Sequence, residues 1–165
     1  SELQQGEYRS HFYFRAVPDA RPLGENEISS DTTAFAVRLT PIFGITIPVI
    51  IRNGETSVNV TLSGLSLTLV NDTVPWLGFV FNRTGNISVY GDIAVDHVSE
   101  KGKITRVGVA NGVAVYTPNN LRRFKLELTR HPDVDYNKGT LRVTYSASSD
   151  VKPARFAEAE LALQR

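Results

Sequence analysis

Apolar and polar side chains alternate with a period of two residues along most of this chain. Residues 7–15 and 34–52 form two long apolar segments of this kind, and the polar residues 18–33 lie between them. Such alternation is typical of β-strands with one buried face. The pattern therefore predicts two long N-terminal β segments joined by a polar loop. Because Pro41 and Pro48 cannot donate a backbone hydrogen bond, we expect the second segment to bend or to lie at the edge of a sheet.

The turn dipeptide Asn53-Gly54 ends this region, and short β-rich segments follow it every eight to twelve residues. The expected strands are 57–62, 65–70, 76–82, 87–96, 103–110, 112–117, 121–129, 139–146 and 154–163. Turn residues separate them, among which Ser63-Gly64 is one example and Asn111-Gly112 is a strong β-hairpin signal. Residues 154–163 fit neither a helical nor a strand period cleanly, and we expect a closing strand there, with a helix as the alternative. This spacing is typical of an antiparallel β-sandwich, in which we expect Trp76 and Tyr90 to be core aromatics.

The two N-terminal β segments need a partner. Two strands alone are not a stable domain in water, and their open edges can pair with other chains. We therefore expect them to be covered by the rest of this chain, by a second copy or by a strand of another protein. For this chain on its own we expect self-association through residues 34–52, as a homodimer or a strand-swapped oligomer.

Composition narrows the possible functions. The chain has 165 residues, of which 41% are hydrophobic and 21% are charged, as in ordinary globular proteins. A formal net charge of +1 provides no basic surface for nucleic acid or for an anionic membrane. The absence of cysteine excludes disulfides, cysteine-containing zinc sites and thiol catalysis. The longest apolar stretch, residues 42–51, is about half of what a membrane-spanning helix needs, so we expect no membrane insertion.

The sequence offers no motif for catalysis. Its three histidines, His11, His97 and His131, lie in separate segments, and residues 133–135 lack the glycine and the distal glutamate of a calcium-binding loop. Nucleotide-binding and hydrolase motifs are absent as well. We therefore expect a protein that is not an enzyme, with no catalytic residues, no cofactor and no metal.

Several segments resemble one known family. Residues 6–18 (GEYRSHFYFRAVP), 35–39 (FAVRL) and 45–52 (ITIPVIIR) are similar to the last two strands of the first domain of bacterial periplasmic pilus (fimbrial) chaperones, in particular their divergent chaperone-like members. Further segments resemble the second domain of that family, namely 67–69 (LTL), 79–86 (FVFNRTGN), 89–93 (VYGDI) and 112–118 (GVAVYTP).

The resemblance implies two immunoglobulin-like domains, of which residues 1–54 would supply the last two strands of an incomplete first domain and residues 55–165 the second. Ser1 is not an initiator methionine, and no signal peptide follows it, so we expect the chain to begin within a longer protein. The resemblance also implies a periplasmic location.

The resemblance further implies how a partner would bind. In this family a strand of the first domain completes an unfinished pilus subunit, which is donor-strand complementation, a form of β-strand addition. The lending side chains would be Phe35, Val37, Leu39 and Ile42. The expected function is thus that of a chaperone-like protein that binds pilus subunits. A stand-alone immunoglobulin-like binding or adhesion module on the cell envelope is the alternative.

Overall fold

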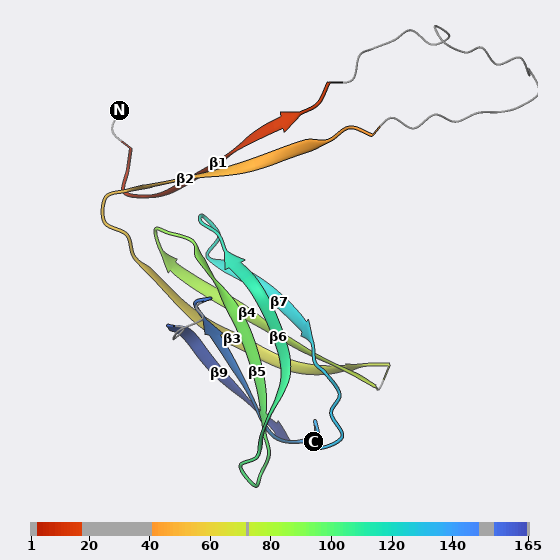
Figure 1. Ribbon diagram of the computed structural model, residues 1–165. Coiled ribbons are helices and arrows are strands. Elements are labelled where there is room, and N and C mark those ends of the chain that lie inside the picture. The colour runs from red at the N-terminus through yellow and green to blue at the C-terminus, as the bar shows by residue number, and fades with distance from the viewer. Residues whose placement is uncertain (1–2, 18–40, 72, 149–153, 165) are drawn as a thin grey trace, which may run out of the picture. The chain divides into compact units, whose positions relative to one another are not determined.

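The computed structural model describes residues 3–17, 41–71, 73–148 and 154–164. These residues contain no helix and form nine β-strands in three sheets. The strands are β1 (Gly6–Arg15), β2 (Gly44–Asn53), β3 (Val58–Val70), β4 (Val74–Gly85), β5 (Val89–Val98), β6 (Ile104–Val115), β7 (Leu121–Glu127), β8 (Lys138–Ser146) and β9 (Arg155–Gln164), as labelled in Figure 1. The all-β fold class expected from the alternation is confirmed.

The chain divides into two compact units. One consists of Ser1–Glu7 with Arg52–Arg165, and the other of Tyr8–Ile51. The strands β1 and β2 form a two-stranded sheet of their own, and the other seven strands form the sandwich. The break predicted at Asn53-Gly54 lies between β2 and β3, where Gly54 takes the positive φ of 70° that a residue without a Cβ tolerates.

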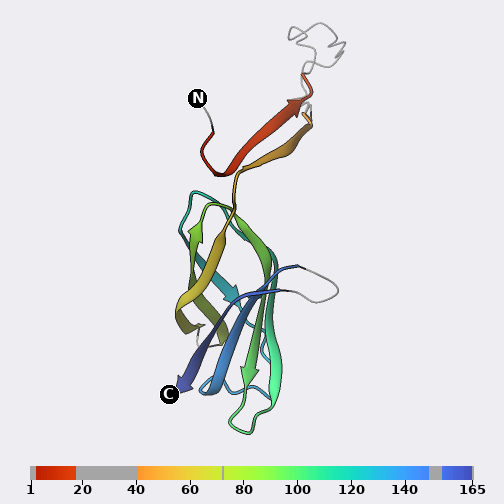
Figure 2. The same ribbon diagram turned by 90° about the vertical axis from the view of Figure 1, so that its left-hand side faces the viewer.

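The sandwich consists of two antiparallel sheets packed face to face. Its smaller sheet has the order β3-β4-β7 and its larger sheet the order β6-β5-β8-β9, and Figure 2 shows the two layers from the side. The fourth sandwich strand, β6, pairs with β5 in the larger sheet. In an immunoglobulin constant domain the fourth strand belongs to the other sheet, so the immunoglobulin-like description in detail stays a prediction.

The core forms because the strands alternate cleanly. On β4 the side chains of Leu77, Phe79 and Phe81 point inward and are buried, whereas their neighbours are half exposed. The ring of Phe81 packs edge-on against Tyr145 of β8, with 5.0 Å between the ring centroids. The Tyr145 hydroxyl donates to the carbonyl of Val113 at 2.7 Å, so the buried ring leaves no unpaired polar atom. Aromatic packing thus joins the two sheets, and the hydroxyl is satisfied within the larger sheet.

The expected core role of two aromatic residues is wrong. Trp76 is only half buried and does not belong to the core, because Pro75 and Leu77 occupy the inward positions of β4 on either side of it. Tyr90 is 58% exposed, because Val89 and Gly91 take the inward positions of β5. Both faces of these segments carry apolar residues, so alternation alone did not show which face is buried.

The hairpin expected at Asn111-Gly112 is also wrong. Strand β6 runs through this dipeptide, and the register against β5 shifts there, between the pairs Gly91–Val113 and Ile93–Ala110. Gly112 has a φ of 69°, and its N–H donates to the Asp92 carboxylate at 2.8 Å. The glycine therefore makes a β-bulge, which needs the same positive φ as a tight turn.

The turn expected at Ser63-Gly64 is a bulge too. Strand β3 continues through it, and its register against β4 shifts between Ser63 and Ser66. Gly64 has a φ of 62°. Residues 154–163, by contrast, form the expected closing strand, since β9 pairs with β8 along its length.

Candidate functional site

The two-stranded sheet of β1 and β2, here called the ribbon, is the most unusual surface of the described residues. The N–H of Ala16, just after β1, donates to the carbonyl of Phe43, just before β2, at 3.0 Å. At the other end Arg52 of β2 pairs with Glu7 of β1. The strands therefore run antiparallel. Ala16 lies nine positions after Glu7, and Arg52 lies nine positions after Phe43. Because the two spacings are equal, the strands have no net bulge between these contacts, and the residues that lie opposite each other can be assigned.

One side of the ribbon is apolar except for Ser10. In this register Phe12 lies opposite Ile47 and Phe14 lies opposite Ile45. Side chains alternate along a strand, so the same side carries a set here called the apolar face, namely Tyr8, Phe12, Phe14, Ile45, Ile47, Val49 and Ile51. All of these are exposed except Val49, which is half exposed. An exposed apolar surface of this size usually marks an interaction site.

The opposite side of the ribbon differs in chemistry. Strand β1 contributes Arg9, His11, Tyr13 and Arg15 to it, whereas β2 contributes Thr46, Pro48 and Ile50. Gly44 belongs to this side as well, and a Cβ there would lie 2.8 Å from the ring of Tyr13. The positive side chains favour solvent, so the apolar face is the side that requires cover.

The base of the ribbon is held by polar contacts. The Arg52 guanidinium donates to the Glu7 carboxylate at 3.2 Å, and the Glu7 side chain is fully buried while that of Arg52 is 57% exposed. The Asn53 side chain donates to the carbonyl of Leu3 at 2.8 Å and to that of Gln4 at 3.3 Å. The buried Glu7 carboxylate is thus paired with the Arg52 guanidinium, and this pairing offsets the cost of burying the charge.

Asn86, in the turn between β4 and β5, binds the chain on both sides of the ribbon's base. Its side-chain amide donates to the carbonyl of Glu55 at 2.9 Å, and its side-chain oxygen accepts from the N–H of Ser57 at 2.9 Å. Its backbone carbonyl accepts from the N–H of Glu7 at 2.9 Å. One residue therefore holds the segments that lead into and out of the ribbon. This role could not be read from the sequence, because Glu7, Glu55 and Ser57 are distant from Asn86 along the chain.

A buried arginine supports the same turn. Arg83 of β4 is only 2% exposed and donates to the carbonyls of Gly85, Ile87 and Asn119 at 2.9 to 3.0 Å. It also donates to the side-chain oxygen of Asn120 at 3.3 Å. A guanidinium carries five N–H donors in a rigid fork, which lets one side chain bind two loops. This role could not be read from the sequence, because Arg83 looks like any strand residue there.

Only one of the four expected donor-strand residues is among the residues that the structure describes. Phe35, Val37 and Leu39 lie outside the described residues. Ile42, which precedes β2, is 52% exposed. The assignment of these four residues therefore stays a prediction. The apolar residues of β1 and β2 extend the candidate surface beyond the expected set.

The edges of the sandwich are less suited to strand addition than the ribbon. Register irregularities interrupt both β3 and β6, and bulges of this kind discourage pairing with another chain. The remaining edge strand of the larger sheet, β9, carries the charged residues Arg155, Glu158 and Glu160. The short edge strand β7 carries Arg122, Arg123 and Lys125. These features are common protections of exposed edges, and they leave β1 and β2 as the better candidates.

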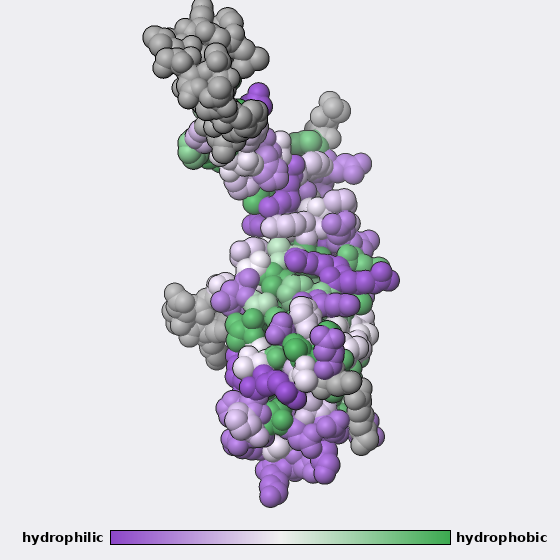
Figure 3. Space-filling model, turned by 90° about the vertical axis from the view of Figure 1, so that its right-hand side faces the viewer, coloured by the Kyte–Doolittle hydropathy of each residue, from purple (hydrophilic) through white to green (hydrophobic). Residues whose placement is uncertain are grey.

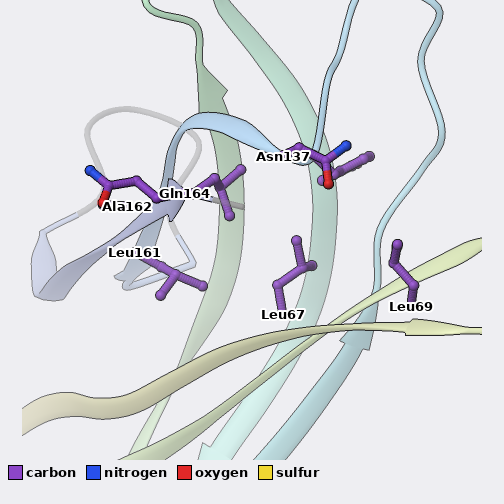
Figure 4. A pocket seen from close by; sticks show the side chains of 8 residues that line it. Leu67, Leu69, Asn137, Leu161, Ala162 and Gln164 are labelled. Carbon is purple, nitrogen blue, oxygen red and sulfur yellow. The ribbon is translucent and has the colours of Figure 1, made fainter.

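The sandwich has a cavity of about 150 Å³ between β3 and β9, lined by both apolar and polar side chains. Leu67 and Leu69 of β3 lie across it from Leu161 of β9, and the amide side chain of Asn137 is at its rim (Figure 4). No acidic or basic side chain is among the described residues that line it. The cavity therefore offers apolar contact, and the titratable group among its described lining residues is the Tyr136 hydroxyl, which donates to the carbonyl of Thr129 at 2.8 Å.

Apolar side chains are also exposed on the sandwich, among them Ile104, Val109, Tyr116 and Leu121. Figure 3 shows that, on the side in view, apolar atoms lie among polar ones. Isolated exposed apolar residues are normal on soluble domains. The ribbon differs because its apolar side chains follow one another along one face of two paired strands.

Titratable groups of the described residues gather near the loop between β7 and β8. The Lys103 ammonium, 2.7 Å from the Asp133 carboxylate, lowers the pKa of Asp133, and hydrogen bonds from Asn137 lower the pKa of Asp135. Burial raises the pKa of Tyr136 to about 12. These are ordinary consequences of ion pairing, hydrogen bonding and desolvation, and none prepares a group for catalysis.

The histidines take separate places. His97 is buried and its Nε2 lies 2.9 Å from the carbonyl of Lys138, whereas His11 and His131 are exposed. No group of three metal-ligating side chains is found in the part of the chain that the structure describes. That part also contains no helix long and apolar enough to cross a membrane.

No protein-family model matches this chain, and no curated protein matches it. Among solved structures, the chain is similar to part of DesR, a β-glucosidase from Streptomyces venezuelae in complex with D-glucose, with a TM-score of 0.44 and 10% sequence identity. The match covers 67% of this chain and 16% of the enzyme's chain. A similarity at this level carries no argument about function, and the ribbon remains the feature on which a function can be argued.

Proposed function

We propose that this protein binds another polypeptide by β-strand addition to its ribbon, as a non-enzymatic chaperone-like protein of pilus or fimbrial subunits. The observation that carries the proposal is the exposed apolar face, above all Phe12, Phe14, Ile45 and Ile47. Burial of a large apolar side chain is worth about 1.5–3 kcal/mol, so covering these side chains provides a strong driving force. The polar and charged opposite side directs a partner to this one face.

The partner we propose is a β-sandwich subunit that lacks one strand. Such a subunit has an open groove lined by apolar side chains and by unpaired backbone groups, and an added strand satisfies both. Strand β2 presents Ile45, Ile47, Val49 and Ile51 at every second position, which is the spacing that a groove of this kind accepts. The resemblance to periplasmic pilus chaperones makes a pilin-like subunit the first partner to test, in the periplasm.

Binding of a pilin-like subunit without its donor strand tests the proposal directly. We expect the full chain to capture it in a one-to-one complex on size exclusion. The double variant Phe35→Asp with Val37→Asp tests the expected donor strand, and Ile45→Asp with Ile47→Asp tests the ribbon. If Phe35→Asp with Val37→Asp leaves capture unchanged but Ile45→Asp with Ile47→Asp abolishes it, the donor-strand assignment is wrong and the ribbon is the binding site. If neither variant changes capture, strand addition at this site is wrong.

A stand-alone binding or adhesion module is the second candidate. It is favoured by the sandwich having a core of its own, built from β3 to β9. In that case the partner would bind the sandwich, and substitutions on the apolar face would change self-association without changing adhesion. The two Asp variants above therefore separate the two candidates.

A further inference from the structure

The direction of the backbone groups along β2 can be worked out from the register of the ribbon. In an antiparallel pair, opposite residues alternate between pairs that exchange both backbone hydrogen bonds and pairs whose backbone groups point away. The bond from Ala16 to Phe43 fixes this alternation. The pairs of Ile45 with Phe14 and of Ile47 with Phe12 therefore exchange bonds. The backbone groups of Gly44, Thr46, Pro48 and Ile50 point away from β1, toward the outer edge of β2.

Pro48 thus lies at a position whose backbone faces the open edge. This explains why a proline is tolerated in the middle of a ten-residue strand, because β1 does not need the missing N–H. It also interrupts the edge. Gly44 and Thr46 offer an N–H and a carbonyl to an added strand, whereas Pro48 offers only its carbonyl. None of the other described strands pairs with this edge.

The two edges of the ribbon differ in a second way. On β1 the outward-pointing positions include Arg9 and Arg15, and charged side chains protect an exposed edge. On β2 the corresponding positions from Gly44 to Ile50 carry no charge. An added strand therefore meets less resistance at β2, and Pro48 is the obstacle that remains on that edge.

We infer that Pro48 is a specificity-determining residue that ends strand addition on β2, so that a partner strand pairs with the segment before Pro48 and not with Ile50 beyond it. The inference rests on the proposed function, and it names the register of that same site. The partner's carbonyl that would lie opposite position 48 has no donor, and an unsatisfied buried carbonyl weakens pairing past this point by roughly tenfold. Arg52, Asn53 and their contacts at the base of the ribbon are thereby kept out of the partner's reach.

The substitution Pro48→Val restores the missing donor and tests the inference. In a complex of the full chain with a strand-deficient pilin-like subunit, we expect slowed amide hydrogen exchange at Gly44 and Thr46 and unchanged exchange at Ile50. In Pro48→Val we expect slowed exchange at Ile50 as well. Pro132→Val is the matched control, because it makes the same chemical change at an exposed turn residue of the sandwich, away from the ribbon and the expected donor strand. Slowed exchange at Ile50 in the wild-type complex would overturn the inference.

A second variant moves the obstacle. Thr46→Pro places a proline at another outward-pointing position, so β1 and β2 stay paired while the available edge becomes shorter. We expect subunit binding to weaken about tenfold, with the circular dichroism of the free protein unchanged. Unchanged binding by Thr46→Pro would contradict an edge that pairs through this residue.

A measurement without any subunit separates this inference from the proposed function. With an intact donor at position 48, the β2 edges of two copies can pair along their whole length, so we expect Pro48→Val to lower the dimer dissociation constant at least tenfold in sedimentation velocity. Wild type and Pro132→Val should not differ in sedimentation. If no subunit is captured, the proposed function fails, and the sedimentation result still decides the role of Pro48. If Pro48→Val changes neither sedimentation nor exchange at Ile50, the inference is wrong.

Discussion

Replacing isoleucines of the apolar face by alanine should weaken partner binding. The expected loss depends on how much of each side chain is exposed and is left for a partner to bury. Ile45 is 67% exposed and Ile47 is 49% exposed, so about half to two thirds of each side chain remains to be buried by a partner. Full burial of such a side chain is worth about 1.5–3 kcal/mol. Ile45 should therefore contribute about 1–2 kcal/mol and Ile47 about 1 kcal/mol. The double variant Ile45→Ala with Ile47→Ala is expected to lose roughly 2–3 kcal/mol.

A loss of this size corresponds to a dissociation constant that rises about 30- to 150-fold. Titration calorimetry of a strand-deficient pilin-like subunit into each variant measures it. Ile104 supplies a matched control, since it is an isoleucine of similar exposure, 59%, on β6 of the sandwich. Ile104→Ala should change the dissociation constant less than twofold.

The reasoning fails if the double variant binds within threefold of wild type, or if Ile104→Ala weakens binding as much as the double variant does. The first result would show that the partner leaves the apolar face uncovered. The second would move the binding site to the sandwich. Urea denaturation of the same proteins checks that the sandwich stays folded, because the ribbon substitutions lie outside its core.

Three further predictions concern the support of the ribbon and the sandwich. Arg83→Met removes the donors to three backbone carbonyls and should lower the free energy of unfolding by about 3–5 kcal/mol; urea denaturation followed by Trp76 fluorescence measures it, and a loss below 1 kcal/mol contradicts the role given to Arg83. Asn86→Ala removes two side-chain hydrogen bonds and should cost about 1–2 kcal/mol, with faster amide exchange at Ser57; unchanged exchange there would show that Asn86 does not hold this segment. Because the pKa of Tyr136 is raised to about 12, the folded state keeps a proton that the unfolded state releases above pH 10. The free energy of unfolding should therefore fall between pH 10 and 12, and that of Tyr136→Phe should fall less over the same range. An equal fall in both proteins would show that Tyr136 is not the group responsible.

The sandwich shows which features the alternation of apolar and polar residues can predict and which it cannot. Alternation with a period of two placed most of the strands. Residues 154–163 fit neither period cleanly, and a strand is expected there because the rest of the chain is β; β9 confirms the strand, with Glu158 and Glu160 opposite Thr144 and Arg142. The same pattern could not distinguish a hairpin from a bulge at Asn111-Gly112. Both need a glycine with positive φ, and the pairing of β6 with β5 on both sides of the dipeptide, where the Gly112 N–H binds the Asp92 carboxylate, distinguishes them.

The candidate site was predictable in part for the same reason. The apolar rows of β1 and β2 and the edge position of Pro48 follow from side-chain alternation and from the missing N–H of proline, which are properties of the chain itself. The tertiary structure decided which residues face each other across the ribbon. It also decided that Trp76 points outward and that Arg83 and Asn86 bind the loops at the ribbon's base. These roles depend on carbonyls and side chains that are distant in the sequence and meet only when the chain is folded.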